Sequence, residues 1–448
     1  MTRSLGVDMA PLQRKTMGQQ RAYGMISLLL AVLLLPMATA VDSTVSVNTT
    51  WSGDMVLSGN VTVASGATLT IAPGTNVDAK EYSIIIEGVL VADESSFFSS
   101  VVPETQGSHG QGLWPGIVIE TGVEATLAEV TVANASAGVL VRGVLSASDV
   151  VFNDAYRGLS LMGGTATVDE FEANRMDYEA VYVETGSLNL SNGLANEVAV
   201  GLANHGTAYV DDFVVKEAGV GVQSLGGSLT LDGISVENTS VGIATVSGAS
   251  STVSHFNGHG MPLAIDAGDA DDFSLSSGNL HGERFMFGQG TSQMHVSNVD
   301  FFSTSADEMR PAVDVRCDGQ CTLEHTDIHS PMVGVSWSGS GTSFMDNVSV
   351  YAIEQAVETS GSGHAVWTNL TVNASTTGLS VQTPTSSLTD IHVELTANQA
   401  IGIDLLGGQH TWFDVVVEKA FTSADQTSIG LNAWYSDLTL DQFTSRNV

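Results

Sequence analysis

The stretch from Gly138 reads GVLVRGVLSASDVVFNDAY to Tyr156 and, after Arg157, GLSLMGGTATVDEFEANRMDYE to Glu179. Each half begins with glycine, runs through alternating apolar residues to a second glycine, and continues in another alternating run. Such alternation with period 2 predicts β-strands. The phrase recurs every 20 to 22 residues from Gly116 to Gly430. A fixed period of this length is typical of a solenoid.

Each repeat unit is too short for a strand-helix-strand crossover or a four-stranded propeller blade. No unit holds an uninterrupted run with 3.6 periodicity, and a strand-helix-strand crossover needs about 30 residues. Stacked coils of a parallel β-helix, about 4.8 Å apart, fit the period, and parallel crossovers are nearly always right-handed. We therefore predict an all-β, right-handed parallel β-helix solenoid of about 15 coils of 20–22 residues. Its inward ladder is predicted to comprise Ile117, Val139, Leu159, Val181, Leu202, Val222, Ile243 and Leu263.

Asparagine recurs four to six residues before many coil starts. Stacked coils would place these side chains in one column at a turn, where amides bond along the ladder and asparagine tolerates a left-handed backbone. The predicted structural column comprises Asn134, Asn153, Asn174, Asn196, Asn238, Asn257, Asn373 and Asn398.

Two segments resemble a known family. LWPGIVIE, ending at Glu120, and the glycine-led coils after it resemble β-helix surface proteins of the pectin-lyase-like superfamily, of the archaeal and bacterial type. The segment Thr50–Val77 resembles the opening of such proteins. The resemblance covers roughly Val45 to the end and implies the fold, whereas enzymes, adhesins and structural proteins all share that fold.

Residues 1–40 are interpreted as a signal peptide. Basic residues precede the apolar run Met25–Leu35, and Ala38-Thr39-Ala40 is an A-x-A cleavage site. An uncleaved anchor is the alternative, because Met25–Val41 lies at the lower edge of the length that spans a bilayer. This segment is expected to engage the export machinery, so the protein is expected to be secreted or at the cell surface. Residues 41–105 are predicted to form an N-terminal cap and the first coils, and residues 106–448 the β-helix repeat domain.

The chain is strongly acidic, with a formal net charge of −35. Nucleic-acid binding needs basic patches, so nucleic acid is excluded as a partner. The charge is interpreted mainly as a solubilising surface. No cofactor and no metal site are predicted, although surface carboxylates could bind Ca²⁺ weakly.

The two cysteines, Cys317 and Cys321, flank an Asp-Gly turn. In an exported protein this arrangement predicts a disulfide. Two thiols without a second pair do not complete a four-ligand metal shell.

Eight N-x-S/T sequons are present. Three of them, Asn134, Asn238 and Asn373, are assigned to the asparagine column. The predicted glycosylation candidates are therefore Asn48, Asn60, Asn189, Asn347 and Asn369.

No catalytic residue is predicted. Gly258-His259-Gly260 resembles a polygalacturonase element, but the Asn-Thr-Asp and Arg-Ile-Lys elements of that family are missing. Acid-base hydrolysis needs two carboxylates facing one bond. The outward row of the first strand is expected to carry no cluster of acids, bases or arginines in its first half: Val118, Leu140, Ser160, Tyr182, Ala203, Gln223, Ala244 and Ala264.

Further along that row, Asp314, Glu358 and Asp404 fall on alternate coils, about 10 Å apart. Solvated strand-face acids are the favoured interpretation. The tryptophans are scattered and are expected to fill the core more than to line a sugar-binding strip. We therefore expect an exported, acidic, non-enzymatic cell-surface β-helix protein, adhesive or envelope-structural, whose partners are carbohydrate or other surface proteins. The alternative is a polysaccharide lyase or glycoside hydrolase of the pectin-lyase-like fold.

Overall fold

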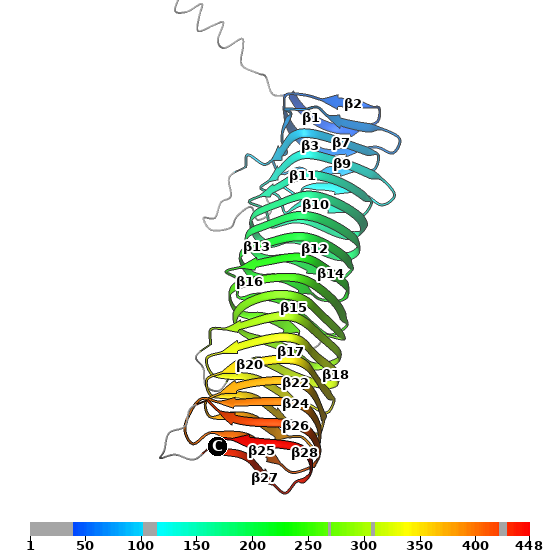
Figure 1. The fold of residues 1–448 in the computed structure, drawn as a ribbon. Helices are drawn as coiled ribbons and strands as arrows, with labels where there is room; N and C mark the ends of the chain where they lie inside the picture. Colours follow the sequence, from blue (N-terminus) through cyan, green and yellow to red (C-terminus); the bar gives the residue numbers. More distant parts are fainter. Residues whose placement is uncertain (1–38, 102–113, 268–269, 306–309, 421–427) are drawn as a thin grey trace, which may run out of the picture.

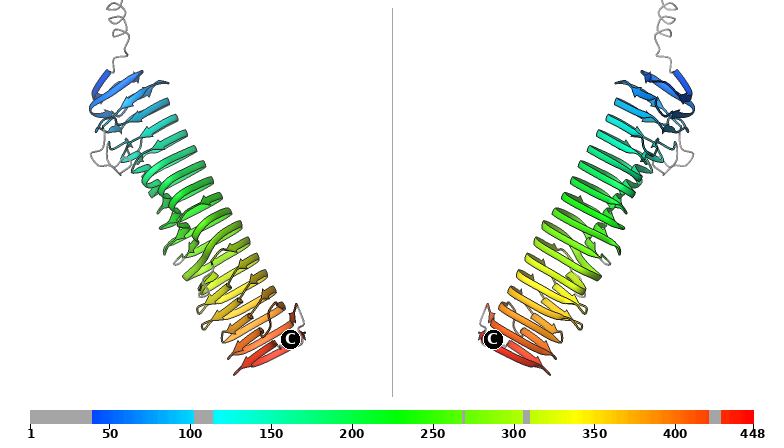
Figure 2. Two further views of the ribbon diagram at one scale, coloured as in Figure 1. Left: turned by 90° about the vertical axis from the view of Figure 1, so that its left-hand side faces the viewer. Right: turned by 90° about the vertical axis from the view of Figure 1, so that its right-hand side faces the viewer.

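The computed structural model describes residues 39–101, 114–267, 270–305, 310–420 and 428–448. This part of the chain is all-β and forms a parallel β-solenoid of about 16 turns, which confirms the predicted architecture. The coils stack in sequence order along one axis and produce an elongated rod, with β1 near one end and β28 at the other (Figures 1 and 2). Among the described residues there is no helix of the length and apolar character needed to cross a membrane.

All strands belong to one 28-stranded parallel sheet. The first coils contain β1 (Thr39–Val45), β2 (Thr49–Trp51), β3 (Asp54–Val63), β4 (Thr68–Ile71), β5 (Asn76–Asp78), β6 (Ile84–Ile86), β7 (Val89–Phe98), β8 (Ile117–Ile119) and β9 (Glu124–Ala133). The middle coils contain β10 (Ala137–Val141), β11 (Val144–Asn153), β12 (Arg157–Asn204), β13 (Thr207–Ser224), β14 (Gly227–Glu237), β15 (Val241–Thr245), β16 (Ala249–Ala267), β17 (Asp272–Ser303) and β18 (Pro311–Ser330). The last coils contain β19 (Val333–Ser338), β20 (Thr342–Ala352), β21 (Gln355–Ser360), β22 (His364–Ala374), β23 (Thr377–Gln382), β24 (Thr385–Leu395), β25 (Ile401–Leu406), β26 (Gln409–Lys419), β27 (Ile429–Trp434) and β28 (Asp437–Arg446).

The predicted signal segment lies outside the described residues except for its last two. Thr39 and Ala40 belong to β1 and pair with Met55 and Val56 of β3. Cleavage after Ala40 would therefore remove the first two residues of a paired strand; whether cleavage occurs stays a prediction. The ladder continues from β6 to β8 and from β7 to β9, across the predicted boundary at residue 105.

The inward ladder follows the prediction up to Ile243. Val139 pairs with Ile117 on one side and Leu159 on the other, and all three are buried. The expectation for Leu263 is wrong, because Ile243 pairs with Ile265, while Leu263 is half-buried. Alternate residues around this point are all apolar, so the pattern permitted either register.

A left-handed residue turns one corner of each coil, at the point where the strand pairing skips a position. Asp149 and Glu170 are examples in consecutive coils, with φ of 50° and 54°. Asparagine and aspartate tolerate this conformation better than most residues. Period-2 alternation does not predict this column, which comprises Glu94, Glu129, Asp149, Glu170, Asn192, Asp212, Gly233, His255, Ser277, Asn298, His325, Asn347, Asn369, Asp390, Asp414 and Gln442.

Candidate ligand-binding groove

A buried ion pair lies at the start of β12, on the outer side of the first strand of two consecutive coils. The Arg157 guanidinium donates from Nε to Glu179 Oε2 at 2.6 Å and from Nη2 to Oε1 at 3.4 Å. The two residues are 22 positions apart, one coil repeat. Glu179 is only 4% exposed, so its carboxylate depends on Arg157 in place of water.

Three tyrosine rings surround the same guanidinium. Its central carbon lies 5.6 Å from the ring centroid of Tyr156, 5.5 Å from that of Tyr178 and 4.2 Å from that of Tyr182. The rings of Tyr156 and Tyr178 stack on each other with centroids 5.5 Å apart and planes 9° apart. Cation–π attraction therefore adds to the ion pair and holds the cluster in one arrangement.

A groove of about 330 Å³ opens beside this cluster. Apolar side chains and one tyrosine face make up most of its wall, and Arg157, Ser160 and Glu81 add polar groups. Ser160 is 1% exposed, and its hydroxyl has no hydrogen-bond partner among the described residues. The full lining is Glu81, Pro115, Ser136, Ala137, Leu140, Tyr156, Arg157, Ser160 and Met162.

The groove has the composition of a binding site more than of a hydrolytic centre. Apolar walls with a few placed polar groups are typical of small-ligand pockets. The Glu179 carboxylate is bonded to Arg157 and is not part of the lining, in which Glu81 is the one carboxylate. Within the described residues, no group of three or more His, Cys, Asp or Glu side chains could hold a metal ion.

The predicted outward row keeps its register at Ser160, which pairs with Leu140, and at Ala203, which pairs with Gln223, although Ser160 and Ala203 are buried. The prediction is wrong at Ala264, because Asp266 pairs with Ala244 in its place. Arg157 and Glu179 lie beside this row and not in it, so the expectation for the row did not cover this charged pair. The signal was present in the sequence: the Tyr-Arg pair at 156–157 and the Tyr-Glu pair at 178–179 are 22 residues apart.

The predicted strand-face acids lie in one row at alternate coils. Asp314 pairs in register with Ser336, which pairs with Glu358. The Asp314 carboxylate accepts from Arg284 at 3.2 Å, and Glu358 accepts from Ser336 at 2.7 Å. Each carboxylate thus has its own local donor.

Further along the row, Asp404 accepts from Asn432 at 2.8 Å. His259, from the Gly-His-Gly element, is exposed and pairs in register with Glu237. The structure does not bring His259 together with the strand-face acids.

The eight asparagines of the predicted column occupy several different registers. Asn153 and Asn174 pair, and the Asn174 amide donates to Asn153 Oδ1 at 3.2 Å. Asn196 pairs with Lys216 instead of another asparagine. Asn134 and Asn238 lie one residue later, at left-handed positions with φ of 59° and 54°.

The other three asparagines of the predicted column, Asn257, Asn373 and Asn398, lie outside both of these registers. Asn257 is exposed and pairs with Asn279. Asn373 donates to Glu394 at 3.0 Å, and its position is taken in the three preceding coils by Phe302, His329 and Tyr351. Asn398 follows β24 and accepts from Lys419 at 2.6 Å.

The predicted glycosylation candidates Asn48, Asn60, Asn189, Asn347 and Asn369 are all exposed. The Asn369 amide donates to Asp346 at 2.9 Å, whereas Asn48 and Asn60 each accept from a backbone amide through Oδ1. Asn134, which was assigned to the column, donates to the Ser99 carbonyl at 3.1 Å. Glycan occupancy itself stays a prediction.

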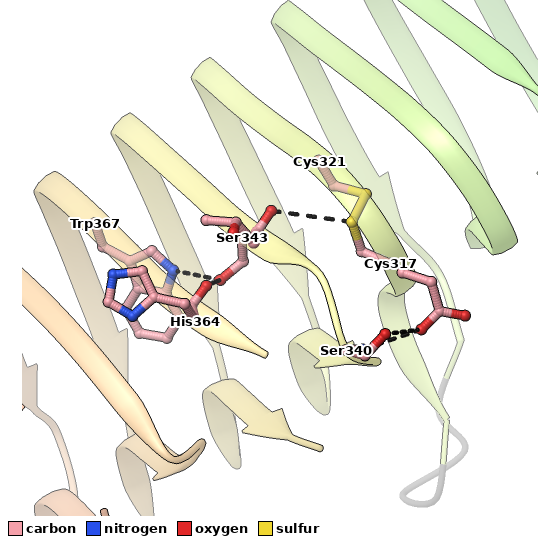
Figure 3. Close-up of a disulfide and its surroundings, with 8 residues drawn as sticks. Cys317, Cys321, Ser340, Ser343, His364 and Trp367 are labelled. Carbon is pink, nitrogen blue, oxygen red and sulfur yellow. Dashed lines mark hydrogen bonds between the residues drawn. A yellow bond between two sulfur atoms is a disulfide. The ribbon is translucent and has the colours of Figure 1, made fainter. Parts of the chain in front are cut away.

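Cys317 and Cys321 form a disulfide across the turn, with Cα atoms 6.1 Å apart (Figure 3). Both cysteines are buried. On the coils that follow, Trp367 Nε1 donates to Ser343 Oγ at 3.3 Å inside the coil (Figure 3). Four of the tryptophans are buried in the core: Trp114, Trp337, Trp367 and Trp412. Trp434, on β27, is 56% exposed.

No protein-family profile and no curated protein sequence matches the chain. Among solved structures it is similar to the tailspike protein of Escherichia coli bacteriophage HK620 in complex with pentasaccharide, with 11% identity, a TM-score of 0.31, and coverage of 94% of this chain and 76% of that one. It is also similar to DFA-IIIase from Arthrobacter chlorophenolicus A6 without its lid, with 11% identity, a TM-score of 0.27, and coverage of 77% and 82%. Likenesses this loose transfer no site, so the function is inferred from the chain's own residues.

Proposed function

We propose that the protein is an exported, non-enzymatic β-helix of the pectin-lyase-like type that binds carbohydrate at the cell surface through the groove beside Tyr156. The observation that carries this proposal is the arrangement of Tyr156 and Arg157 at the rim of an apolar groove, with Arg157 fixed by the buried Glu179. A tyrosine face covers the apolar side of a sugar ring, and polar groups at the rim orient its hydroxyls. Export and surface location rest on the N-terminal segment and the acidic composition.

The proposal of binding without cleavage rests on how the carboxylates are engaged. A glycosidase places two carboxyl groups on either side of one bond. The groove lining contains one carboxylate, Glu81, and the nearby Glu179 is held by Arg157. On the same strand row the acids recur on alternate coils. A rigid rod that presents such a groove is suited to adhesion or to a place in the envelope.

The test is a glycan array with the secreted protein and with Tyr156→Ala. Tyr209→Ala is the matched control, because Tyr209 is 46% exposed but projects from β13, away from the groove. We expect glycan binding that Tyr156→Ala abolishes and Tyr209→Ala retains. Equal loss in both variants, or reducing-end release from a polysaccharide, would contradict the proposal; the second result would favour a lyase or hydrolase.

A further inference from the structure

The ionic state of the groove restricts the class of glycan that it accepts. Arg157 is the cation of the lining, and both of its bonds to Glu179 are made. Glu179 already neutralises the charge of Arg157 through two of the five N–H donors of the guanidinium, so a ligand carboxylate would meet a neutral ion pair and not an uncompensated cation. A carboxylate that displaced Glu179 would leave it buried without its partner, which is strongly unfavourable. Glu81 also lines the groove, and the chain as a whole carries a charge of −35. Anionic sugars are therefore disfavoured.

The groove wall provides an apolar contact surface for a ring. Leu140 and Met162 lie on the same side of the first strand as Ser160, and Tyr156 closes the rim. The C–H face of a pyranose packs against such side chains while its hydroxyls point outward. Met162 is unbranched and adaptable, so it can shift when a ligand enters.

The Ser160 hydroxyl is a polar group without a hydrogen-bond partner in the groove wall. It is buried and makes no hydrogen bond to any described residue, and Ser160 lines the groove. A buried unsatisfied hydroxyl is unusual in a native protein. Rotation about the Cα–Cβ bond turns the hydroxyl toward the groove, where a ligand hydroxyl can bond to it.

From these observations we propose that the groove binds one sugar ring of a neutral glycan, with the sugar's apolar face on Tyr156 and Leu140 and one sugar hydroxyl on Ser160. Ser160 is then a specificity-determining residue, and uronic acids are rejected. This inference rests on the proposed carbohydrate-binding function.

The test is a calorimetric titration of the secreted protein with neutral hexasaccharides (maltohexaose, cellohexaose and mannohexaose) and with hexagalacturonate. We expect at least one neutral hexasaccharide to bind more tightly than hexagalacturonate. Ser160→Ala should weaken that binding about 3- to 10-fold, the range for one neutral hydrogen bond, with an unchanged or higher melting temperature. Ser146→Ala is the matched control, since Ser146 is exposed on β11 outside the groove.

The outcomes separate this inference from the proposed function. Equal affinity in Ser160→Ala and the unaltered protein would overturn the role of Ser160 while leaving carbohydrate binding intact. Tighter binding of hexagalacturonate than of every neutral hexasaccharide would overturn the neutral class. No binding to any glycan, here or on the array, would overturn the proposed function itself.

Discussion

Replacement of Arg157 by methionine should destabilise its coil far more than the same change at another ion-paired arginine. Methionine keeps much of the aliphatic stem but removes the charge, so Glu179 becomes a buried carboxylate without a partner. Removal of one member of a buried pair costs about 3–5 kcal/mol. The side chains of Arg157 and Glu179 are 23% and 5% exposed, which places the pair in this class.

Arg142→Met is the matched control. Arg142 bonds to Glu120 at 2.8 Å, also between consecutive coils, but their side chains are 41% and 34% exposed. An ion pair this exposed to water contributes about 0–1 kcal/mol to the free energy of unfolding. The comparison therefore tests burial together with the tyrosine contacts of Arg157, because residue type and partner type are the same and both pairs link consecutive coils.

Hydrogen-exchange mass spectrometry is the appropriate assay, because a solenoid opens locally and each coil contacts only its neighbours. Peptides covering the start of β12 should lose protection in Arg157→Met and keep it in Arg142→Met. The double variant Arg157→Met/Glu179→Gln should regain most of the protection, because the uncompensated charge is gone. Equal effects of the two single variants, both near 1 kcal/mol or less, would show that the Arg157 pair is not buried in solution.

Three further predictions concern stability. Ser224→Ala should leave the melting temperature unchanged or raise it, because the Ser224 hydroxyl is buried without a hydrogen-bond partner among the described residues. Ser386→Ala should lower the free energy of unfolding by about 1–3 kcal/mol, because His410 and Trp412 lose the hydroxyl to which both are bonded. Hydrogen bonds from Thr368 and Asn369 hold the pKa of Asp346 below its ordinary value. The ionised Asp346 therefore stabilises the folded state fully above about pH 4, the pKa of aspartate in the unfolded chain. This stabilisation is lost as the pH falls through the lower pKa of Asp346 in the folded state. Melting curves of Asp346→Asn and the unaltered protein should thus differ at pH 7 and converge in acid, and a difference that grows in acid would contradict this sign. Reduction of the Cys317–Cys321 disulfide should lower the free energy of unfolding by about 2 kcal/mol or less, because the closed loop is very short. A larger loss of stability in melting curves of the reduced protein would refute that magnitude.

The period and the apolar alternation were sufficient to predict the coils and most of the inward ladder. Both signals repeat many times, so an error in one coil is corrected by its neighbours, as at Val139 and Leu159. The disulfide was also predictable, because it lies within a single short turn. The predicted register is wrong at Leu263, because Met261, Leu263 and Ile265 are all apolar and the strand pairing is irregular on either side of Leu263.

The groove and the asparagine positions could not be predicted in the same way, because each depends on the alignment of two coils to a single residue. A slip of one residue turns a side chain to the other face of a strand. Asn153 and Asn174 are in register and bond to each other, whereas Asn134 and Asn238 lie one residue later and turn the backbone. Once the register is known, the Tyr-Arg pair at 156–157 and the Tyr-Glu pair at 178–179 are seen to occupy equivalent positions of consecutive coils beside the groove.

In this solenoid a residue 21 to 23 positions away along the chain is a lateral neighbour, as a residue four positions away is in a helix. Asp169 accepts from Ser191 and Asn192, and Asp346 accepts from Thr368 and Asn369, at the same corner of different coils. Asp232 repeats the arrangement with Ser254 and His255. Complementary residues at this spacing therefore interact laterally between coils. The Arg157–Glu179 pair differs from the others in its buried carboxylate, so loss of its arginine should be the most costly.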